Sequence, residues 1–128
     1  MLKKKLGIEV IERNWGWGKN LTNHFKIPST LIIPEGCARV GRGVLEGCDW
    51  LKKVVISEGV LWIRGYAFWK CKKLEEVIIS ESVEKIGYEA FRECKNATII
   101  LKKKEEDFEK IGSYAFWKCK DVKEEIRA

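Results

Sequence analysis

Cysteine is the residue type in this chain with the widest possible chemistry, and its spacing is regular. Four of the five cysteines, Cys48, Cys71, Cys94 and Cys119, follow one another at steps of 23, 23 and 25 residues. No pair has the close C-x-x-C spacing of a zinc site, and His24 is the only histidine. A Cys–His or Ser–His catalytic pair would therefore depend on His24 alone. We expect no metal, no cofactor and no enzymatic activity.

The step of 23 residues is shared by apolar positions, so it belongs to a repeat. The positions that keep step with the cysteines are Leu45, Phe68 and Phe91; Val40, Ile63 and Ile86; and Val44, Ala67 and Ala90. Such a period is typical of a solenoid, in which a coil buries its apolar face only by stacking on its neighbours.

The cysteines take apolar positions of this repeat. Cys37, the fifth cysteine, falls where later copies have Val60, Val83 and Phe108. Because a buried thiol behaves as a small hydrophobe, we expect free core cysteines and a reducing compartment. Stacked coils lie only about 5 Å apart, so a ladder of disulfides is the alternative, which the odd number of cysteines disfavours.

Each repeat begins with a strand and a turn and continues with a compact segment. Short β-branched runs predict strands at 31–33, 54–56, 77–79 and 98–101. In the compact segment, the spacing of Ala67, Phe68 and Cys71 is compatible with a helical turn or two. Glycines precede this segment in three copies, where we expect a backbone conformation closed to other residues: Gly41, Gly87 and Gly112.

One stretch of the repeat carries a family resemblance. Residues 79–94 read I-S-E-S-V-E-K-I-G-Y-E-A-F-R-E-C, and the pattern recurs over about residues 31–119. This pattern resembles the BspA-type, or Treponema-type, leucine-rich repeat. The resemblance implies a leucine-rich-repeat solenoid with one short parallel strand and one short helical turn per repeat of about 23 residues. It also implies binding to proteins or cell surfaces, usually without catalysis.

The resemblance predicts a simple division of the chain. Residues 1–30 would be an atypical N-terminal coil or cap, and residues 120–128 an incomplete C-terminal repeat. Between them lie four repeats, at about 31–53, 54–76, 77–101 and 102–119. We align Val122 with Leu74, so a fifth strand would be missing and the last sheet edge would be open or paired in a homodimer.

Charge and hydropathy exclude some function classes. The net charge is +6, but the lysine runs adjoin carboxylates, so nucleic-acid or anionic-surface binding is only an alternative. No apolar run approaches the roughly 18–20 residues that a membrane span needs. With no signal peptide in view and with core cysteines, a cytoplasmic location is favoured.

Two sets of residues are candidates for binding a protein partner. Alternation along the strands predicts an outward apolar ridge of Ile32, Val55 and Ile78, unless these residues merely suit strands. Four tryptophans occupy repeat positions that are charged or polar in other copies: Trp50, Trp62, Trp69 and Trp117. Stacking would place Trp69, Arg92 and Trp117 in one column with cation–π contacts. Such rings either cover the solenoid locally or bind a partner, because Trp and Arg are enriched at interaction hot spots.

The sequence thus predicts a non-catalytic protein-interaction module whose partner is an unidentified protein. The alternatives are a self-assembling structural repeat unit and a basic binder of nucleic acid or anionic surfaces.

Overall fold

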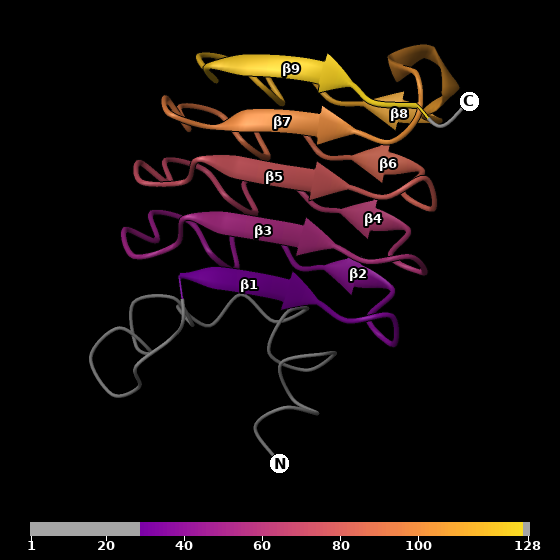
Figure 1. Ribbon diagram of the computed structural model, residues 1–128, viewed down its shortest axis with the longest axis horizontal. Helices are drawn as coiled ribbons and strands as arrows, with labels where there is room; N and C mark the ends of the chain where they lie inside the picture. Colours follow the sequence, from indigo (N-terminus) through magenta and orange to yellow (C-terminus); the bar gives the residue numbers. More distant parts are fainter. Residues whose placement is uncertain (1–28, 127–128) are drawn as a thin grey trace.

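The chain winds into a parallel β-solenoid whose coils stack one upon another (Figure 1). The computed structural model describes residues 29–126. A five-stranded sheet forms one side of the stack, in the order β1 (Thr30–Ile33), β3 (Lys53–Ile56), β5 (Glu76–Ile79), β7 (Thr98–Leu101) and β9 (Asp121–Glu124). A four-stranded sheet forms a second side, in the order β2 (Arg39–Val40), β4 (Trp62–Ile63), β6 (Lys85–Ile86) and β8 (Lys110–Ile111). The solenoid fold expected from the repeat is confirmed.

The strands of the larger sheet pair in register from coil to coil. Val54 is the partner of Leu31 on one side and of Val77 on the other. Val54, Ile56, Val77 and Ile79 are buried, while Val55 and Ile78 between them are half-buried. This alternation follows from the pleat, which turns successive side chains to opposite faces.

The alignment of Val122 with Leu74 is wrong, and a fifth strand is present. Val122 lies in β9 and pairs with Ile99, the counterpart of Val77. The error arose because the last cysteine does not keep its distance from the strand. Cys94 precedes β7 by four residues, whereas Cys119 precedes β9 by only two.

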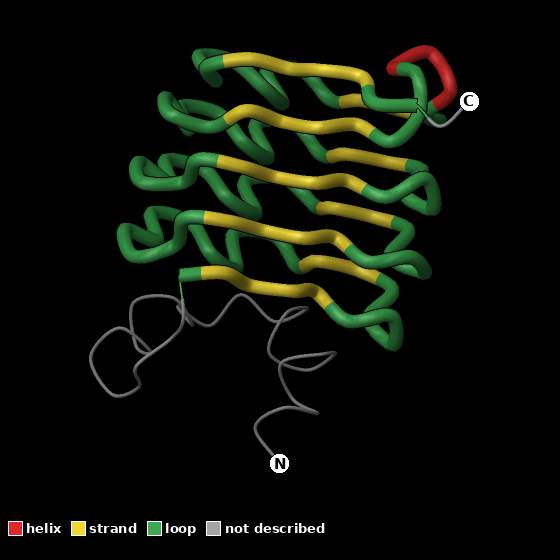
Figure 2. Tube along the Cα trace, viewed as in Figure 1, coloured by secondary structure: helices red, strands yellow, loops and turns green. Residues whose placement is uncertain are grey.

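The third side of each coil consists of two consecutive turns (Figure 2), so helix is a minor feature. In the second coil, Ala67 N–H donates to Arg64 O and Cys71 N–H donates to Phe68 O. The third residue of each turn, Tyr66 or Lys70, has a positive φ, as in a type II turn. Such a residue interrupts an α-helix, although the spacing of the apolar residues is compatible with one.

These turns add a further hydrogen-bond ladder along the stack. The N–H groups of Tyr66, Phe68 and Lys70 donate to the carbonyls of Tyr88, Ala90 and Arg92 in the next coil. A type II turn flips its central peptide relative to a type I turn, and here that peptide bonds to the neighbouring coil. The first four coils are therefore bonded to one another on all three sides.

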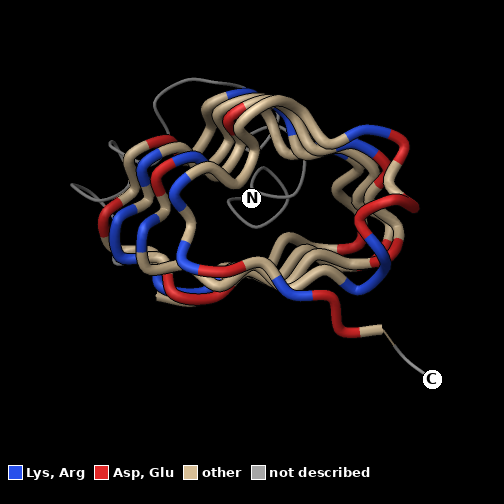
Figure 3. Tube along the Cα trace, turned by 90° about the horizontal axis from the view of Figure 1, so that it is seen from above, with Lys and Arg blue, Asp and Glu red and all other residues tan. Residues whose placement is uncertain are grey.

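The core is a narrow column enclosed by the three sides, and the coils superimpose as a ring around it (Figure 3). Phe68 stacks on Phe91 with ring centroids 5.0 Å apart, and Phe91 stacks on Phe116 at 5.9 Å. The alanine before each of these phenylalanines is buried, which leaves room for close packing of the coils.

Two glycines expected to need an unusual conformation are required for a different reason. None of the three glycines Gly41, Gly87 and Gly112 has a positive φ, so the expected conformation is wrong. A Cβ atom on Gly87 would lie 2.6 Å from the carbonyl carbon of Arg64 in the preceding coil, and one on Gly112 would lie 2.7 Å from Tyr88 Cα. The close approach of the coils, and not the local backbone, excludes a side chain at both positions.

The longer step between the last two cysteines comes from an insertion between β7 and β8. This insertion contains the short 3-10 helix η1 (Glu105–Asp107) and ends in Phe108, which is buried. The expected N-terminal coil, up to residue 28, lies outside the described residues.

Candidate interaction surface

The cysteine thiols lie inside the solenoid. Cys71 Sγ donates a hydrogen bond to Leu45 O, Cys94 Sγ to Phe68 O, and Cys119 Sγ to Phe91 O, each in the preceding coil. Burial raises the pKa of Cys48 from 9.0 to about 12. The hydrogen bond with Cys94, together with burial, raises the pKa of Cys119. Such thiols stay protonated at neutral pH, which is unfavourable for nucleophilic or metal-binding chemistry.

The turn side carries a surface of aromatic and charged residues, which we call the aromatic–cationic surface. It consists of two neighbouring positions of the repeat, taken from three successive coils: Tyr66 with Trp69, Glu89 with Arg92, and Tyr114 with Trp117. The two positions fall on the two turns of each coil, and the hydrogen-bond ladder holds equivalent positions above one another. The fold therefore brings together residues that lie up to 51 positions apart in the chain.

Within this surface an ion pair lies between two aromatic pairs. Tyr66 and Trp69 meet edge to face with centroids 6.0 Å apart, and Tyr114 and Trp117 do so at 5.9 Å. Between them, Arg92 Nη1 lies 2.8 Å from Glu89 Oε1. Edge-to-face contacts suit the quadrupole of the rings and hold them in fixed orientations.

The predicted cation–π column forms at one end only. The Arg92 guanidinium lies 4.5 Å from the centroid of Trp117 and 5.5 Å from that of Tyr114. The cation over Trp69 is instead its neighbour Lys70, whose Nζ is 4.6 Å from the ring centroid. Contacts of this kind contribute about 0.5–1 kcal/mol each at exposed sites, so they orient the rings more than they stabilise the fold.

The tyrosines of this surface were not predicted from the sequence. Tyr66 and Tyr114 occupy one repeat position, but the intervening copy has Glu89 there and the first copy has Gly43. A repeat position that is aromatic in two copies, acidic in one and glycine in another gives no periodic signal. The signal that could have found them is the dipeptide Tyr-Ala, which precedes the core phenylalanine in both copies.

The other two of the four candidate tryptophans lie elsewhere. Trp50 is half-buried and packs against the core, and its Nε1 is buried without a hydrogen-bond partner in the described part of the chain. Trp62 belongs to β4, on the second sheet, where Lys85 Nζ lies 4.8 Å from its ring centroid. The structure thus separates Trp50 and Trp62 from Trp69 and Trp117.

The predicted apolar ridge is continuous on the outer face of the larger sheet. Ile32 pairs with Val55, Val55 with Ile78, and Ile78 with Ile100, so these side chains form one row. Ile32 is 60% exposed, Val55 and Ile78 are half-buried, and Ile100 is 8% exposed. The part of the row available to a partner therefore consists of Ile32, Val55 and Ile78.

Stacked coils of near-identical length and path define the class: this is a parallel β-solenoid repeat protein. Residues 21–125 match the family model described as "BspA type Leucine rich repeat region (6 copies)", and the chain belongs to this family. The predicted resemblance is thereby confirmed. No curated protein and no solved structure gives a significant match.

The family is a non-catalytic repeat family whose members often serve in protein interaction. Across residues 29–126, no helix combines the length and the apolar character needed to cross a bilayer. No group of three or more His, Cys, Asp or Glu side chains in this same part of the chain could hold a metal ion.

Proposed function

We propose that this chain is a non-catalytic module that binds a protein partner through the aromatic–cationic surface. The observation that carries the proposal is the exposure of large rings on a rigid base. Trp117 is 40% exposed and Tyr114 is 60% exposed, although both are held by contacts within the molecule. Rings fixed in this way lose little conformational entropy on binding, and Trp, Tyr and Arg are the residues most enriched at hot spots.

The ridge of Ile32, Val55 and Ile78 is a second candidate contact for the same partner. It is apolar and lies on the larger sheet, away from the turn side. The rings of Trp50 and Trp62 contribute less to this proposal, because one packs against the core and the other lies on the second sheet.

The test compares two substitutions of equally exposed apolar residues. Trp117→Ala removes a ring from the proposed surface, and Leu61→Ala, at 41% exposure, removes a side chain just before β4. A partner captured by the wild-type chain is purified, and its affinity for each variant is measured by calorimetry. We expect Trp117→Ala to weaken binding by about 30-fold, equivalent to about 2 kcal/mol, and Leu61→Ala to leave the affinity unchanged.

Circular dichroism would confirm that both variants fold. Unchanged affinity in Trp117→Ala and also in Trp69→Ala would remove this surface from the site. If the captured partner is a second copy of the chain, the same variants report on self-assembly. A complex whose affinity falls steeply with salt and that contains nucleic acid would favour the basic binder instead.

A further inference from the structure

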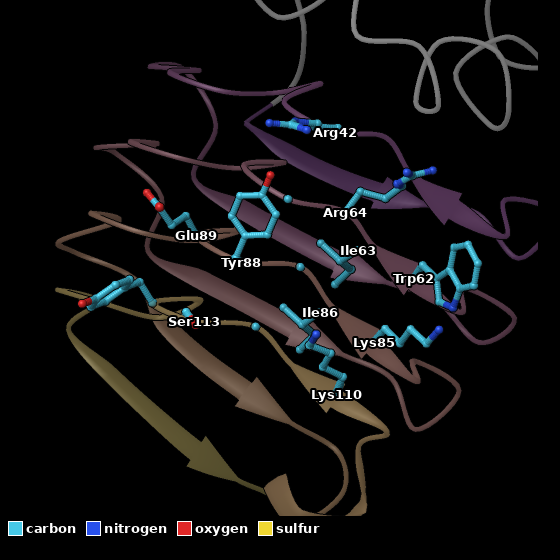
Figure 4. Close-up of a pocket in the computed structure, with 14 residues that line it drawn as sticks. Arg42, Trp62, Ile63, Arg64, Lys85, Ile86, Tyr88, Glu89, Lys110 and Ser113 are labelled. Carbon is cyan, nitrogen blue, oxygen red and sulfur yellow. The ribbon is translucent and has the colours of Figure 1, made fainter.

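A groove with a basic lining crosses the solenoid between the second sheet and the turn side (Figure 4). Its volume is about 760 Å³. Gly65, Gly87 and Gly112 contribute only backbone to its lining. The requirement for glycine at Gly87 and Gly112, set by the contact between coils, also keeps side chains out of the middle of the groove.

Four cationic side chains line this basic groove: Arg42, Arg64, Lys85 and Lys110. The one carboxylate in the lining, Glu89, is bonded to Arg92. Lys85 Nζ lies 3.6 Å from Glu109 Oε1, which neutralises part of its charge. Arg64 and Lys110 are exposed, and neither forms an ion pair within residues 29–126. Unpaired cations beside a concave wall create a positive potential that attracts anionic groups.

Aromatic rings stand among these cations. Trp62 lies under Lys85 on one side of the groove, and Tyr88 lies near Arg42 on the other, with its ring centroid 5.7 Å from the guanidinium. The basic groove can therefore accept carboxylates and also cover an apolar side chain. This combination fits a peptide better than a small inorganic anion.

We propose that the basic groove binds an extended acidic segment of the protein partner. The inference rests on the proposed function, because it names the chemistry of the partner. The groove shares only Glu89 and Tyr114 with the aromatic–cationic surface. Arg42, Arg64, Gly87 and Gly112 belong to four successive coils, and three coil steps span roughly 14 Å. An extended peptide covers that length with about four residues, so the core of the recognised segment is short.

The probe is an end-capped eight-residue peptide of Asp and Glu with one central Tyr. Its comparison is the same peptide with Asn and Gln in place of Asp and Glu. Binding is measured by calorimetry at two salt concentrations. We expect the acidic peptide to bind at least tenfold more tightly than the neutral one, and its affinity to fall with salt.

Two double variants distinguish binding in the groove from a general attraction by the net positive charge of the protein. R64E/K110E reverses two exposed charges in the groove, and K72E/K95E reverses two exposed lysines outside it by the same amount. We expect R64E/K110E to reduce the affinity for the acidic peptide by at least tenfold and K72E/K95E to reduce it less than threefold. The inference is overturned by equal losses in the two variants or by equal binding of the acidic and neutral peptides.

Two further measurements distinguish this inference from other outcomes. A single-stranded oligonucleotide of the same charge that binds more tightly than the peptide, and is lost in R64E/K110E, would assign the groove to nucleic acid and overturn the inference. Trp69→Ala should leave peptide binding unchanged, because neither Trp69 nor its ring partner Tyr66 lines the groove. Failure of the proposed function would appear instead as unchanged affinity for the captured partner in the tryptophan variants, whatever the peptide result.

Discussion

At the scale of single residues, the cysteines show how the solenoid uses a reactive side chain as a structural one. The thiols of Cys71, Cys94 and Cys119 each donate a hydrogen bond to a backbone carbonyl in the preceding coil. In each case this carbonyl belongs to the first residue of a turn. A methyl group in the same place would fill the space but leave that carbonyl with one partner fewer. Cysteine combines small size, apolar character and a weak donor, which suits the narrow core between two stacked coils.

The raised pKa of Cys48 makes the stability of the fold depend on alkaline pH. The native state holds this proton more tightly than the unfolded chain, because the pKa rises from 9.0 to about 12 on folding. The contribution is therefore complete below pH 9 and is lost between pH 9 and pH 12. We expect it to fall by up to about 1.4 kcal/mol per pH unit in that range.

The measurement is urea denaturation of the wild type and of Cys48→Ser at pH 8, 9.5 and 11. The hydroxyl of serine does not titrate in this range, so the difference in the free energy of unfolding between the two proteins isolates the thiol. This difference should narrow as the pH rises. A difference that stays constant from pH 8 to pH 11 would show that the thiol ionises equally in both states.

At the scale of elements, the sequence predicted four of the five strands of the larger sheet and missed β9 and the strands of the smaller sheet. Four-residue runs such as Val77-Ile78-Ile79 have enough β-branched residues to be recognised alone. The strands β2, β4, β6 and β8 have two residues each, and only one of these, as in Ile63 or Ile86, faces the core. Such short strands form because neighbouring coils stack and pair with them. The sequence of a single copy therefore does not predict them.

The sequence predicted which candidate binding residues stack in a column, but not which of them are in contact. The repeat period alone places Trp69, Arg92 and Trp117 at equivalent positions of successive coils. It does not say which ring Arg92 approaches, because that depends on Glu89, which bonds to Arg92 at the neighbouring position. The basic groove was not predicted at all, since its four cationic residues come from three different repeat positions and its middle is defined by the absence of side chains.

The close contact between coils at Gly87 predicts that an added methyl group destabilises the stack. In Gly87→Ala the new methyl group would meet the backbone of Arg64 and Gly65, so the coils must separate locally. We expect a loss of about 3 kcal/mol or more in the free energy of unfolding. Chemical denaturation would measure it.

Gly36→Ala is the matched control, because nothing lies within 4 Å of the position that its Cβ would occupy. Its backbone does not have a positive φ, so we expect this substitution to be neutral or to stabilise the fold by about 0.4–1 kcal/mol. Equal effects of the two substitutions would mean that the coils tolerate a methyl group at Gly87.

At the scale of the whole molecule, each coil is bonded to its neighbours along the chain. Strand β5 has partners on both sides, in β3 and β7, whereas β9 pairs only with β7 in the described part of the chain. In a solenoid, stability is approximately the sum of coil and interface contributions, so local opening should begin where an interface is missing.

Hydrogen exchange followed by mass spectrometry tests whether β9 opens more easily than the inner strands. We expect the amides of Glu76–Ile79 to exchange at least tenfold more slowly than those of Asp121–Glu124. The physical reason is that β9 opens by breaking one interface, while β5 opens only when two are broken. Uniform protection over all coils would instead indicate that the solenoid unfolds as a single cooperative unit.

The hydrogen-bond ladders that join the coils on three sides also have a mechanical consequence. All of them point along the stack, so a force that lifts one end coil loads the bonds of a single interface and not those of the whole molecule. Each released coil adds a loop of about 23 residues, or about 80 Å of extended chain. We expect the molecule to lengthen under load in separate steps while the coils that remain keep their shape.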